Sequence, residues 1–210
     1  AEMANAALPK QKDSGISPLD KLIKVPGGAK DAGIFLKECS HTGKLILRGD
    51  PNDDLFIKAT SKVLGYKLPL TPNTFLKNDE YTSVWLGPDE WLVNSLPGDE
   101  SSLERDLNIA LTDFHHSVTN VSDNSTIIQL SGPNARSVIM KGCAVDVHPR
   151  VFNPGDAFQS NLAAASVIMW QLDLIPTFNI MVRASFASYL WKWLLDAGAE
   201  FGVQIQQKDF

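Results

Sequence analysis

The sequence predicts an α+β fold in which one unit, a strand followed by a helix, further strands and a second helix, occurs twice. Two short β-rich runs end at Gly49 and Gly132, which lie 83 residues apart. Each run precedes a helical pattern, and each half closes on a longer amphipathic helix. The connections between the later strands are too short for parallel crossovers, so mostly antiparallel sheets are expected.

Length and composition indicate a globular protein with a packed core. The 210 residues suffice for one large domain or two closely packed halves. With 44% apolar and 20% charged residues, the chain differs from coiled-coil, collagen-like and wholly disordered proteins. We expect an N-terminal arm over 1–30, which either frays or orders on a neighbouring subunit, and a domain over 31–210. The halves of this domain are expected at about 31–115 and 116–205.

The first half is expected to begin with a short strand over 44–49. A helix over 52–64 should follow, and Gly65 is expected to end it in the left-handed conformation. The helix is predicted from four apolar residues that share one stripe: Leu55, Phe56, Ala59 and Val63.

A hairpin and an amphipathic helix complete the first half. Three strands are expected over 75–76, 81–86 and 91–94. The last two should be joined by a four-residue turn over 87–90. Ser101 and Glu104 have the spacing of a capping box. The helix after them carries an apolar stripe of Leu103, Leu107, Ala110, Leu111 and Phe114.

The second half repeats this order. A strand over 126–132 is followed by a helix over 134–141, which Gly142 is expected to end in the left-handed conformation. The apolar positions of this helix are Ala135, Val138 and Ile139. Three further strands are expected over 157–162, 166–172 and 177–182. Asp173 and Pro176 mark the last turn.

The closing helix of the second half is expected to start at Ser185 and stop at Gly198. Its start lies 84 residues after that of the first closing helix. The predicted apolar stripe consists of Phe186, Tyr189, Leu190, Trp193, Leu194 and Ala197. Trp191 lies off this stripe beside Lys192, which predicts an exposed aromatic surface and therefore an interface.

Charge and cysteine content limit the partners and the compartment. A net charge of -5 without a dense run of Lys or Arg argues against nucleic acid and membrane surfaces as partners. No run of 18 apolar residues could span a bilayer. The N-terminus lacks the apolar core of a signal peptide, and Cys39 and Cys143 form no CxxC motif. These features predict reduced thiols and a cytoplasmic protein.

Motifs that hold nucleotides or activate a serine are absent from the sequence. No GxGxxG follows a strand, and no GxxxxGK[ST] or GxSxG occurs. The Gly27-Gly28 pair follows Pro26 without a preceding strand, so it does not resemble a phosphate cradle. We therefore expect no nucleotide cofactor in this chain.

Two histidine motifs could bind a metal but have simpler interpretations. His115 and His116 are adjacent, so on a helix end their side chains would point about 100° apart. Cys143 and His148 could form a thiolate-imidazole pair or half a zinc site. A second ligand pair and an orienting acid are missing, which favours a turn that packs Cys143 and exposes His148.

The carboxylate candidates for acid-base chemistry are Asp89, Glu90 and Asp123. Asp89 and Glu90 lie in the predicted hairpin turn, where solvation is the simpler expectation. Asp123 lies between Ser122 and Asn124 just before a strand, and an Asx turn to nearby backbone amides is favoured there over catalysis.

Six runs resemble, in order and spacing, the gamma-subunit family of heterotetrameric sarcosine oxidase. They are VWLGPDEWLV (84–93), SGPNAR (131–136), KGCAVDVHPRVF (141–152), QSNLA (159–163), PTFNIMVRASF (176–186) and YLWKWLLDAG (189–198). The resemblance covers about residues 30–200. Specificity lies in the combination, since SGP-x-AR alone recurs across folate-dependent aminomethyltransferases. The resemblance implies the folate-binding domain fold of those enzymes, a duplication of two β-α-β-α units with exchanged first strands.

The resemblance also implies a role. The assembly oxidatively demethylates sarcosine to glycine, hydrogen peroxide and methylene-tetrahydrofolate. FAD, FMN, NAD, tetrahydrofolate and zinc would lie in the alpha, beta and delta subunits, and alpha would be the main contact of a noncatalytic gamma subunit.

No catalytic, cofactor-binding or metal residue is carried over to this chain from the family. Asp123-Asn124-Ser125 lacks the basic residue that relatives often carry after the acid, which weakens a folate-site transfer to this position. The alternative is a free-standing folate-dependent aminomethyltransferase-like or folate-binding protein, although 210 residues match only the first domain of such enzymes.

Overall fold

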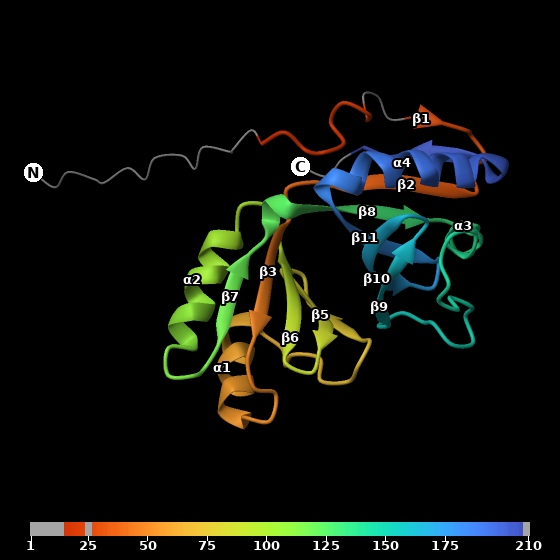
Figure 1. The fold of residues 1–210 in the computed structure, drawn as a ribbon. Helices are drawn as coiled ribbons and strands as arrows, with labels where there is room; N and C mark the ends of the chain where they lie inside the picture. Colours follow the sequence, from red (N-terminus) through yellow and green to blue (C-terminus); the bar gives the residue numbers. More distant parts are fainter. Residues whose placement is uncertain (1–14, 24–26, 208–210) are drawn as a thin grey trace, which may run out of the picture.

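A computed structural model describes residues 15–23 and 27–207 and contains two β-sheets flanked by helices (Figure 1). In the described residues, sheet A has seven strands, in the order β1 (Gly27–Gly28), β12 (Val203–Ile205), β2 (Ile34–Cys39), β8 (Ser125–Ser131), β11 (Thr177–Arg183), β10 (Ala165–Asp173) and β9 (Ala157–Leu162). Sheet B has five, in the order β4 (Phe75–Lys77), β5 (Tyr81–Gly87), β6 (Glu90–Ser95), β3 (Gly43–Arg48) and β7 (Ser117–Asn120). The helices are α1 (Asp54–Leu64), α2 (Glu100–Ala110), α3 (Ala135–Met140) and α4 (Ala184–Gly198), with short 3-10 turns η1 (Ser122–Asn124) and η2 (Ala199–Phe201).

The two halves repeat the same order of elements and exchange their first strands. Strand β2 belongs to the first half but pairs with β8 in sheet A, and β7 belongs to the second half but pairs with β3 in sheet B. Without β1 and β12, both sheets then have the same strand order. Nearly all of the pairings are antiparallel, and β12 with β2 is the parallel pair. This confirms the predicted duplicated α+β fold.

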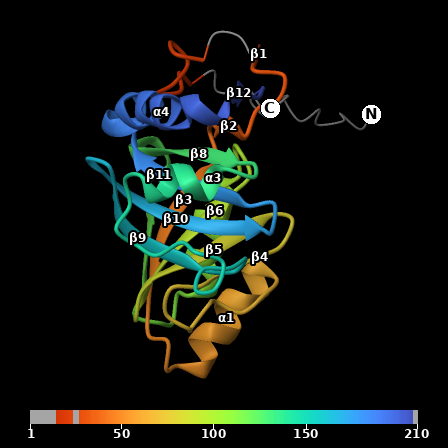
Figure 2. The same ribbon diagram turned by 90° about the vertical axis from the view of Figure 1, so that its right-hand side faces the viewer.

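The apolar core consists of three clusters of buried residues. Helices α3 and α4 cover the outer face of sheet A, and α1 and α2 cover the outer face of sheet B (Figure 1). A third apolar cluster lies between the sheets. Strand alternation produces this division: on β3, Leu45 and Leu47 face the helices while Ile46 faces sheet A. Figure 2 shows the strands of both sheets below α4.

Helix α1 ends at Leu64 as predicted and starts at Asp54, two residues after the predicted start. Asp53 is the N-cap, and its Oδ1 accepts hydrogen bonds from the backbone N–H groups of Leu55 at 2.8 Å and Phe56 at 3.3 Å. Gly65 ends the helix with φ 79°, in the left-handed conformation that glycine adopts without strain. The predicted four-residue hairpin turn is shorter, because Gly87 and Glu90 already pair across β5 and β6.

The predicted capping box at Ser101 is wrong. Helix α2 begins at Glu100 with Asp99 as its N-cap residue, so Ser101 is an exposed residue of the first turn. Gly98, with φ 86°, turns the chain just before the helix and moves its start toward the N-terminus. Ser102 donates its hydroxyl to the Asp99 carbonyl oxygen at 2.9 Å.

Helix α4 ends at Gly198 as predicted, and α3 ends just before Gly142, but the left-handed conformation expected at these two glycines is wrong. Neither glycine has a positive φ, and each lies where a side chain would collide with a neighbour. A Cβ on Gly142 would lie 2.6 Å from the Trp193 ring, and one on Gly198 would lie 2.1 Å from Ile34 Cδ1. Ser185, predicted to be a cap, is instead an exposed residue inside α4, which starts at Ala184. Both glycines therefore permit close packing at the ends of these helices, without a left-handed cap.

Part of the predicted N-terminal arm packs on its own domain. Leu19 is fully buried in the core between sheet A and the helices α3 and α4, with Leu22 and Ile23 against it. Ser17 donates its hydroxyl to a carboxylate oxygen of Glu38, a buried residue of β2. Residues 1–14 and 24–26 of the arm lie outside the described residues. In the part of the chain that the structure describes, no helix has the length and apolar character needed to cross a bilayer.

Candidate functional site

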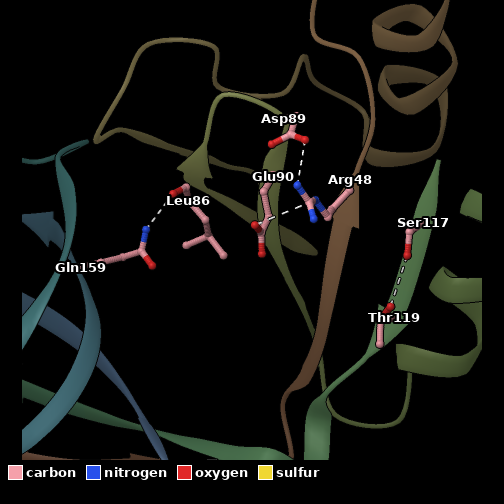
Figure 3. A network of polar contacts seen from close by, with 7 residues as sticks. All are labelled: Arg48, Leu86, Asp89, Glu90, Ser117, Thr119 and Gln159. Atoms are coloured by element: carbon pink, nitrogen blue, oxygen red, sulfur yellow. Dashed lines mark hydrogen bonds and ion pairs between the residues drawn. The ribbon is translucent and has the colours of Figure 1, made fainter. Parts of the chain in front are cut away.

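A group of polar side chains lies at one end of sheet B, on the face directed toward sheet A. We call Arg48, Asp89, Glu90, Ser117 and Thr119 the polar rim (Figure 3). Arg48 ends β3, while Glu90 begins β6 and Ser117 begins β7, and both of these residues are register partners of Arg48. Glu90 lies two residues before Leu92 on β6, and Arg48 two residues after Ile46 on β3. Leu92 and Ile46 face sheet A, so alternation gives Glu90 and Arg48 the same orientation.

Ion pairs occupy the charged groups of the polar rim. Arg48 Nη2 lies 2.8 Å from Asp89 Oδ2, and Arg48 Nε lies 4.0 Å from Glu90 Oε2. About half of the Arg48 and Asp89 side chains is exposed, so this network adds little to stability. Asp89 and Glu90, the acid-base candidates from the sequence, therefore act as solvated partners of Arg48.

The remaining rim contacts are uncharged. The hydroxyls of Ser117 and Thr119 lie 3.4 Å apart on β7. Across from them, Gln159 of β9 donates its amide to the Leu86 carbonyl oxygen at 2.7 Å, which ties sheet A to sheet B (Figure 3). The group can bind polar molecules by hydrogen bonds.

A buried lysine lies at the opposite end of β3. Lys44 is 1% exposed, and its Nζ donates to the carbonyl oxygens of Thr42 at 2.6 Å and Ser122 at 3.4 Å. Burial lowers the pKa of Lys44 to about 8, while the charges of Asp123 and Glu100 act in the opposite direction. These contacts join the turn between β2 and β3 to the turn between β7 and β8. At each of these turns the chain passes from an exchanged strand to the sheet of its own half.

Asp123 lies beside this lysine and does not form the predicted Asx turn. The turn belongs to Asn120, whose Oδ1 accepts from the Ser122 backbone N–H at 3.0 Å and from the Ser122 hydroxyl at 2.6 Å. Asp123 is exposed in η1 and influences Lys44 through its charge. The sequence could not reveal this relation, because Lys44 and Asp123 belong to different halves.

The two histidine motifs do not assemble a site. Both ring nitrogens of His116 have contacts, Nδ1 with the Phe114 carbonyl oxygen at 2.9 Å and Nε2 with Asn108 Oδ1 at 3.1 Å. Half-buried Cys143 packs against the sheet A core, and exposed His148 accepts a hydrogen bond from Arg150 N–H at 3.2 Å. Residues 15–23 and 27–207 contain no group of three His, Cys, Asp or Glu side chains placed to bind a metal.

The prediction that Trp191 forms an exposed aromatic surface is wrong. Trp191 is 1% exposed and packs in the core beneath α4. The exposed aromatics of α4 are Phe186 and Tyr189, which the predicted apolar stripe assigned to the core. Their rings form an edge-to-face pair with centroids 6.5 Å apart. The buried face of α4 consists of Ala187, Leu190, Trp191, Leu194, Ala197 and Gly198, which is also a helical pattern.

Arg136, from the SGPNAR run, has a structural role that was not predicted from the sequence. Its guanidinium donates to the Phe152 carbonyl oxygen at 3.1 Å, to Gln171 Oε1 at 2.8 Å and to the Val147 carbonyl oxygen. The same group lies over the Phe178 ring, 5.4 Å from its centroid. Arg136 thereby fixes the segment between α3 and β9 on sheet A. The signal in the sequence for this role is the basic residue that follows the small residues at the start of the SGPNAR run.

The glycine pair at 27–28 has a packing role that differs from cofactor binding. Gly27 and Gly28 form β1 at the edge of sheet A, paired with Ile205 and Gln204. A Cβ on Gly28 would lie 2.1 Å from the Val203 carbonyl oxygen, so glycine is required for this close approach. Neither residue lies in a strand-to-helix turn, where a phosphate cradle forms.

A shallow apolar depression of about 450 Å³ lies between the two halves. Leu70 and Leu76 on its lining are half exposed, and Pro154 and Gly155 form the opposite wall. The Phe75 N–H donates to the Gly155 carbonyl oxygen at 2.9 Å and holds the two walls together.

The exchanged first strands and the two-sheet core define an α+β fold of the kind found in aminomethyltransferase T. The glycine cleavage system aminomethyltransferase T from Bartonella henselae has this fold, with a TM-score of 0.61 at 15% identity over 84% of this chain and 48% of that chain. The chain belongs to the sarcosine oxidase, gamma subunit family, whose sequence profile matches residues 48–200.

Individual relatives agree with this family. The sarcosine oxidase subunit gamma of Corynebacterium sp. (strain P-1) is 33% identical over 204 residues, covering 96% of this chain and 98% of the relative. The corresponding subunit from Arthrobacter sp. is 31% identical over 201 residues, with 95% and 97% covered. A chain of the heterotetrameric sarcosine oxidase from Corynebacterium sp. U-96, solved with pyrrole 2-carboxylate, matches with a TM-score of 0.80 at 30% identity over 89% of this chain and 96% of that chain.

Proposed function

We propose that this chain is the gamma subunit of a heterotetrameric sarcosine oxidase and supports the assembly of that complex. The similarity to gamma subunits over nearly the whole length of both chains carries the proposal. The chain thus functions as part of an oxidoreductase that acts on sarcosine.

The finer part of the proposal is that the chain contributes no catalytic residue and no cofactor site. The polar rim, with its carboxylates paired to Arg48, and the tight packing at Gly28 support this assignment. FAD, FMN, NAD, tetrahydrofolate and zinc are accordingly assigned to the alpha, beta and delta subunits. Alpha is proposed as the main contact, in a cytoplasmic complex that releases glycine, hydrogen peroxide and methylene-tetrahydrofolate. Cys39 and Cys143 are thiols and form no disulfide, which is compatible with a reducing compartment.

Co-expression with its partner subunits tests the role in assembly. We expect a tagged chain to retain alpha, beta and delta and to bring flavin absorbance and sarcosine oxidation with it. Expressed alone, the same chain should show neither property. Sarcosine oxidation by the isolated chain would refute the noncatalytic assignment, and failure to retain any flavoprotein would refute the role in the complex.

A free-standing folate-binding protein is the second candidate, and the aminomethyltransferase fold favours it. Titration of the isolated chain with tetrahydrofolate separates the two candidates. Saturable binding in the micromolar range would favour the second function, while absence of binding together with recovery of the complex would favour the first.

A further inference from the structure

The turn between β10 and β11 exposes two large apolar side chains, Leu174 and Ile175, which we call the hairpin tip. Leu174 is 83% exposed and Ile175 is 69% exposed. The backbone of the turn is nevertheless fixed, because Asp173 Oδ1 accepts a hydrogen bond from the Ile175 N–H at 3.0 Å. The Gln171 side chain also donates to the Asp173 carbonyl oxygen at 2.7 Å. The hairpin tip is therefore an ordered turn whose apolar side chains lie in solvent.

The corresponding turn of the first half is polar. Strands β5 and β6 occupy in sheet B the positions that β10 and β11 occupy in sheet A, and each pair has a register shift just before its turn. The first-half turn contains Pro88 and Asp89, and Asp89 pairs with Arg48. The same turn thus forms without large apolar residues. Folding alone does not explain the side chains of the hairpin tip.

The hairpin tip is continuous with the apolar depression between the two halves. Gly155, on one wall of the depression, donates its backbone N–H to the Gln171 carbonyl oxygen at 3.2 Å. Gln171 is the residue whose side chain binds Asp173 at the base of the hairpin tip. Figure 2 shows β4, β9 and β10 close together on the side of the molecule that faces the viewer. Half-exposed Leu70 and Leu76 line the other wall.

Exposed Val151 lies near the same end of β10. Arg136 Nη2 donates to the Phe152 carbonyl oxygen at 3.1 Å and to Gln171 Oε1 at 2.8 Å, so these two acceptors are neighbours. Val151 precedes Phe152 and is half exposed. We call the five exposed residues of this region the apolar surface: Leu70, Leu76, Val151, Leu174 and Ile175.

The apolar surface is large enough for one side of a protein–protein interface. Each of its residues is 45% exposed or more. Together they present on the order of 500 Å² of apolar area, near the upper end for the largest patch of a monomeric protein. A standard interface buries about 800 Å² on each partner, and about 60% of this area is apolar. The two apolar areas are therefore similar.

The charged groups near the apolar surface already have partners within this chain. Asp156, the charged residue on the lining of the depression, accepts the Asn153 N–H at 2.7 Å. Asp146 and Arg150, in the loop before β9, pair with each other at 3.3 Å. A strongly charged partner would find little to bind here, and a cation that is already paired offers little to anionic lipid heads. An apolar, uncharged protein surface fits best.

We propose that the apolar surface is the site where another subunit of the sarcosine oxidase complex docks, an inference that rests on the proposed function. A pocket on that subunit receives the hairpin tip, and one of its apolar side chains enters the depression. Docking removes the apolar area from water, which explains why the second-half turn carries Leu174 and Ile175 where the first-half turn is polar.

Co-purification of partner subunits with a tagged full chain tests the proposal, in about 1 M salt so that charge interactions are screened. We expect the double variant Leu174→Ser with Ile175→Ser to retain at least about tenfold less of its partners, because two large apolar side chains no longer contribute to binding. Leu55→Ser with Ile109→Ser is the matched control. It removes the same residue types at 66% and 67% exposure from α1 and α2, and it should retain as much as the wild type.

The outcomes separate this inference from the proposed function. Equal retention by the wild type and the hairpin-tip variant, or an equal loss in the control variant, would overturn the docking surface and leave the role in assembly intact. A wild-type chain that retains no subunit would overturn both. Self-association of the isolated chain, or its binding to phosphatidylcholine vesicles, would overturn the proposal if the hairpin-tip variant abolished it. The surface would then belong to a second copy or to lipid.

Hydroxyl-radical footprinting covers the case in which the hairpin-tip variant fails to fold, since it measures the exposure of side chains in the wild-type chain. Leu174 and Ile175 should be labelled in the isolated chain and protected in the complex. Leu55 and Ile109 should be labelled in both states. Equal labelling of the hairpin tip in the isolated chain and in the complex would overturn the proposal.

Discussion

At the scale of single residues, burial gives Lys44 a measurable effect on pH dependence. The pKa of Lys44 is lowered to about 8 in the folded protein from 10.5, so between these values the unfolded chain binds more protons. Stability contributed by this residue therefore rises with pH through that window. Relative to Lys44→Met, the wild type should gain about 2 kcal/mol from pH 7 to 9.5. Urea unfolding of both proteins at the two pH values measures the difference, and parallel pH profiles would contradict it.

Arg136 supports a second residue-scale prediction. Its guanidinium binds two backbone carbonyl oxygens and Gln171 Oε1 at once, a set that a lysine cannot reproduce because it lacks the planar fork. Arg136→Lys should lower the free energy of unfolding by about 2 kcal/mol, since hydrogen bonds from charged groups contribute about 1.5–3 kcal/mol.

Limited proteolysis provides a local readout for Arg136. Faster cleavage is expected between α3 and β9, the segment that Arg136 holds. Arg150→Lys is the matched control, because that arginine is exposed in the same segment and pairs with Asp146 at the surface. Equal cleavage of both variants would contradict the assigned role of Arg136.

At the scale of elements, the start of α1 has a side-chain cap in the structure, whereas the cap predicted from the sequence for the start of α2 is not formed. Asp53 accepts two backbone hydrogen bonds at the start of α1, whereas Ser101, the cap predicted for α2, makes none of this kind. Asp53→Ala should therefore cost about 1 kcal/mol, and Ser101→Ala should be close to neutral. Chemical denaturation of both variants measures the effect, and an equal loss in both would refute the distinction.

Helix α4 supports a similar comparison of its two faces. Trp191 is fully buried, so Trp191→Ala should lower the free energy of unfolding by about 3–5 kcal/mol. Phe186 is 43% exposed, and Phe186→Ala should cost much less in the isolated chain. Thermal unfolding distinguishes the faces. A larger loss for Phe186→Ala would restore the stripe expected from the sequence.

The elements also show how far the sequence could predict this protein. Alternating apolar residues and turn residues predicted eight of the strands to within a few positions, because these patterns are local. The residues alone did not predict β1, β2, β7 and β12, and β2 and β7 are the two exchanged strands, whose pairing depends on the other half of the chain. Helix α4 has apolar residues on nearly every side, so its periodicity could not determine which aromatics are buried. The candidate site depended on contacts between halves, such as Lys44 with Ser122 and Gln159 with Leu86, which no local pattern contains.

At the scale of the whole molecule, the exchange of first strands makes the two halves depend on each other. Strand β2 occupies a position inside sheet A between β12 and β8, and β7 forms the edge of sheet B beside β3. Separation at the connection between His115 and His116 would leave sheet A without an internal strand. It would also expose apolar residues of the cluster between the sheets, such as Leu92 and Trp170.

Fragments 1–115 and 116–210 should therefore fail to fold alone and should fold together. We expect each fragment to unfold without a cooperative transition, because β2 and β7 lack the partners that complete their hydrogen bonds. An equimolar mixture should regain a cooperative transition and the near-ultraviolet signal of buried tryptophans. Circular dichroism during thermal unfolding measures both. Cooperative unfolding of either fragment alone would show that a half is an independent domain, and the exchanged strands would then contribute little to folding.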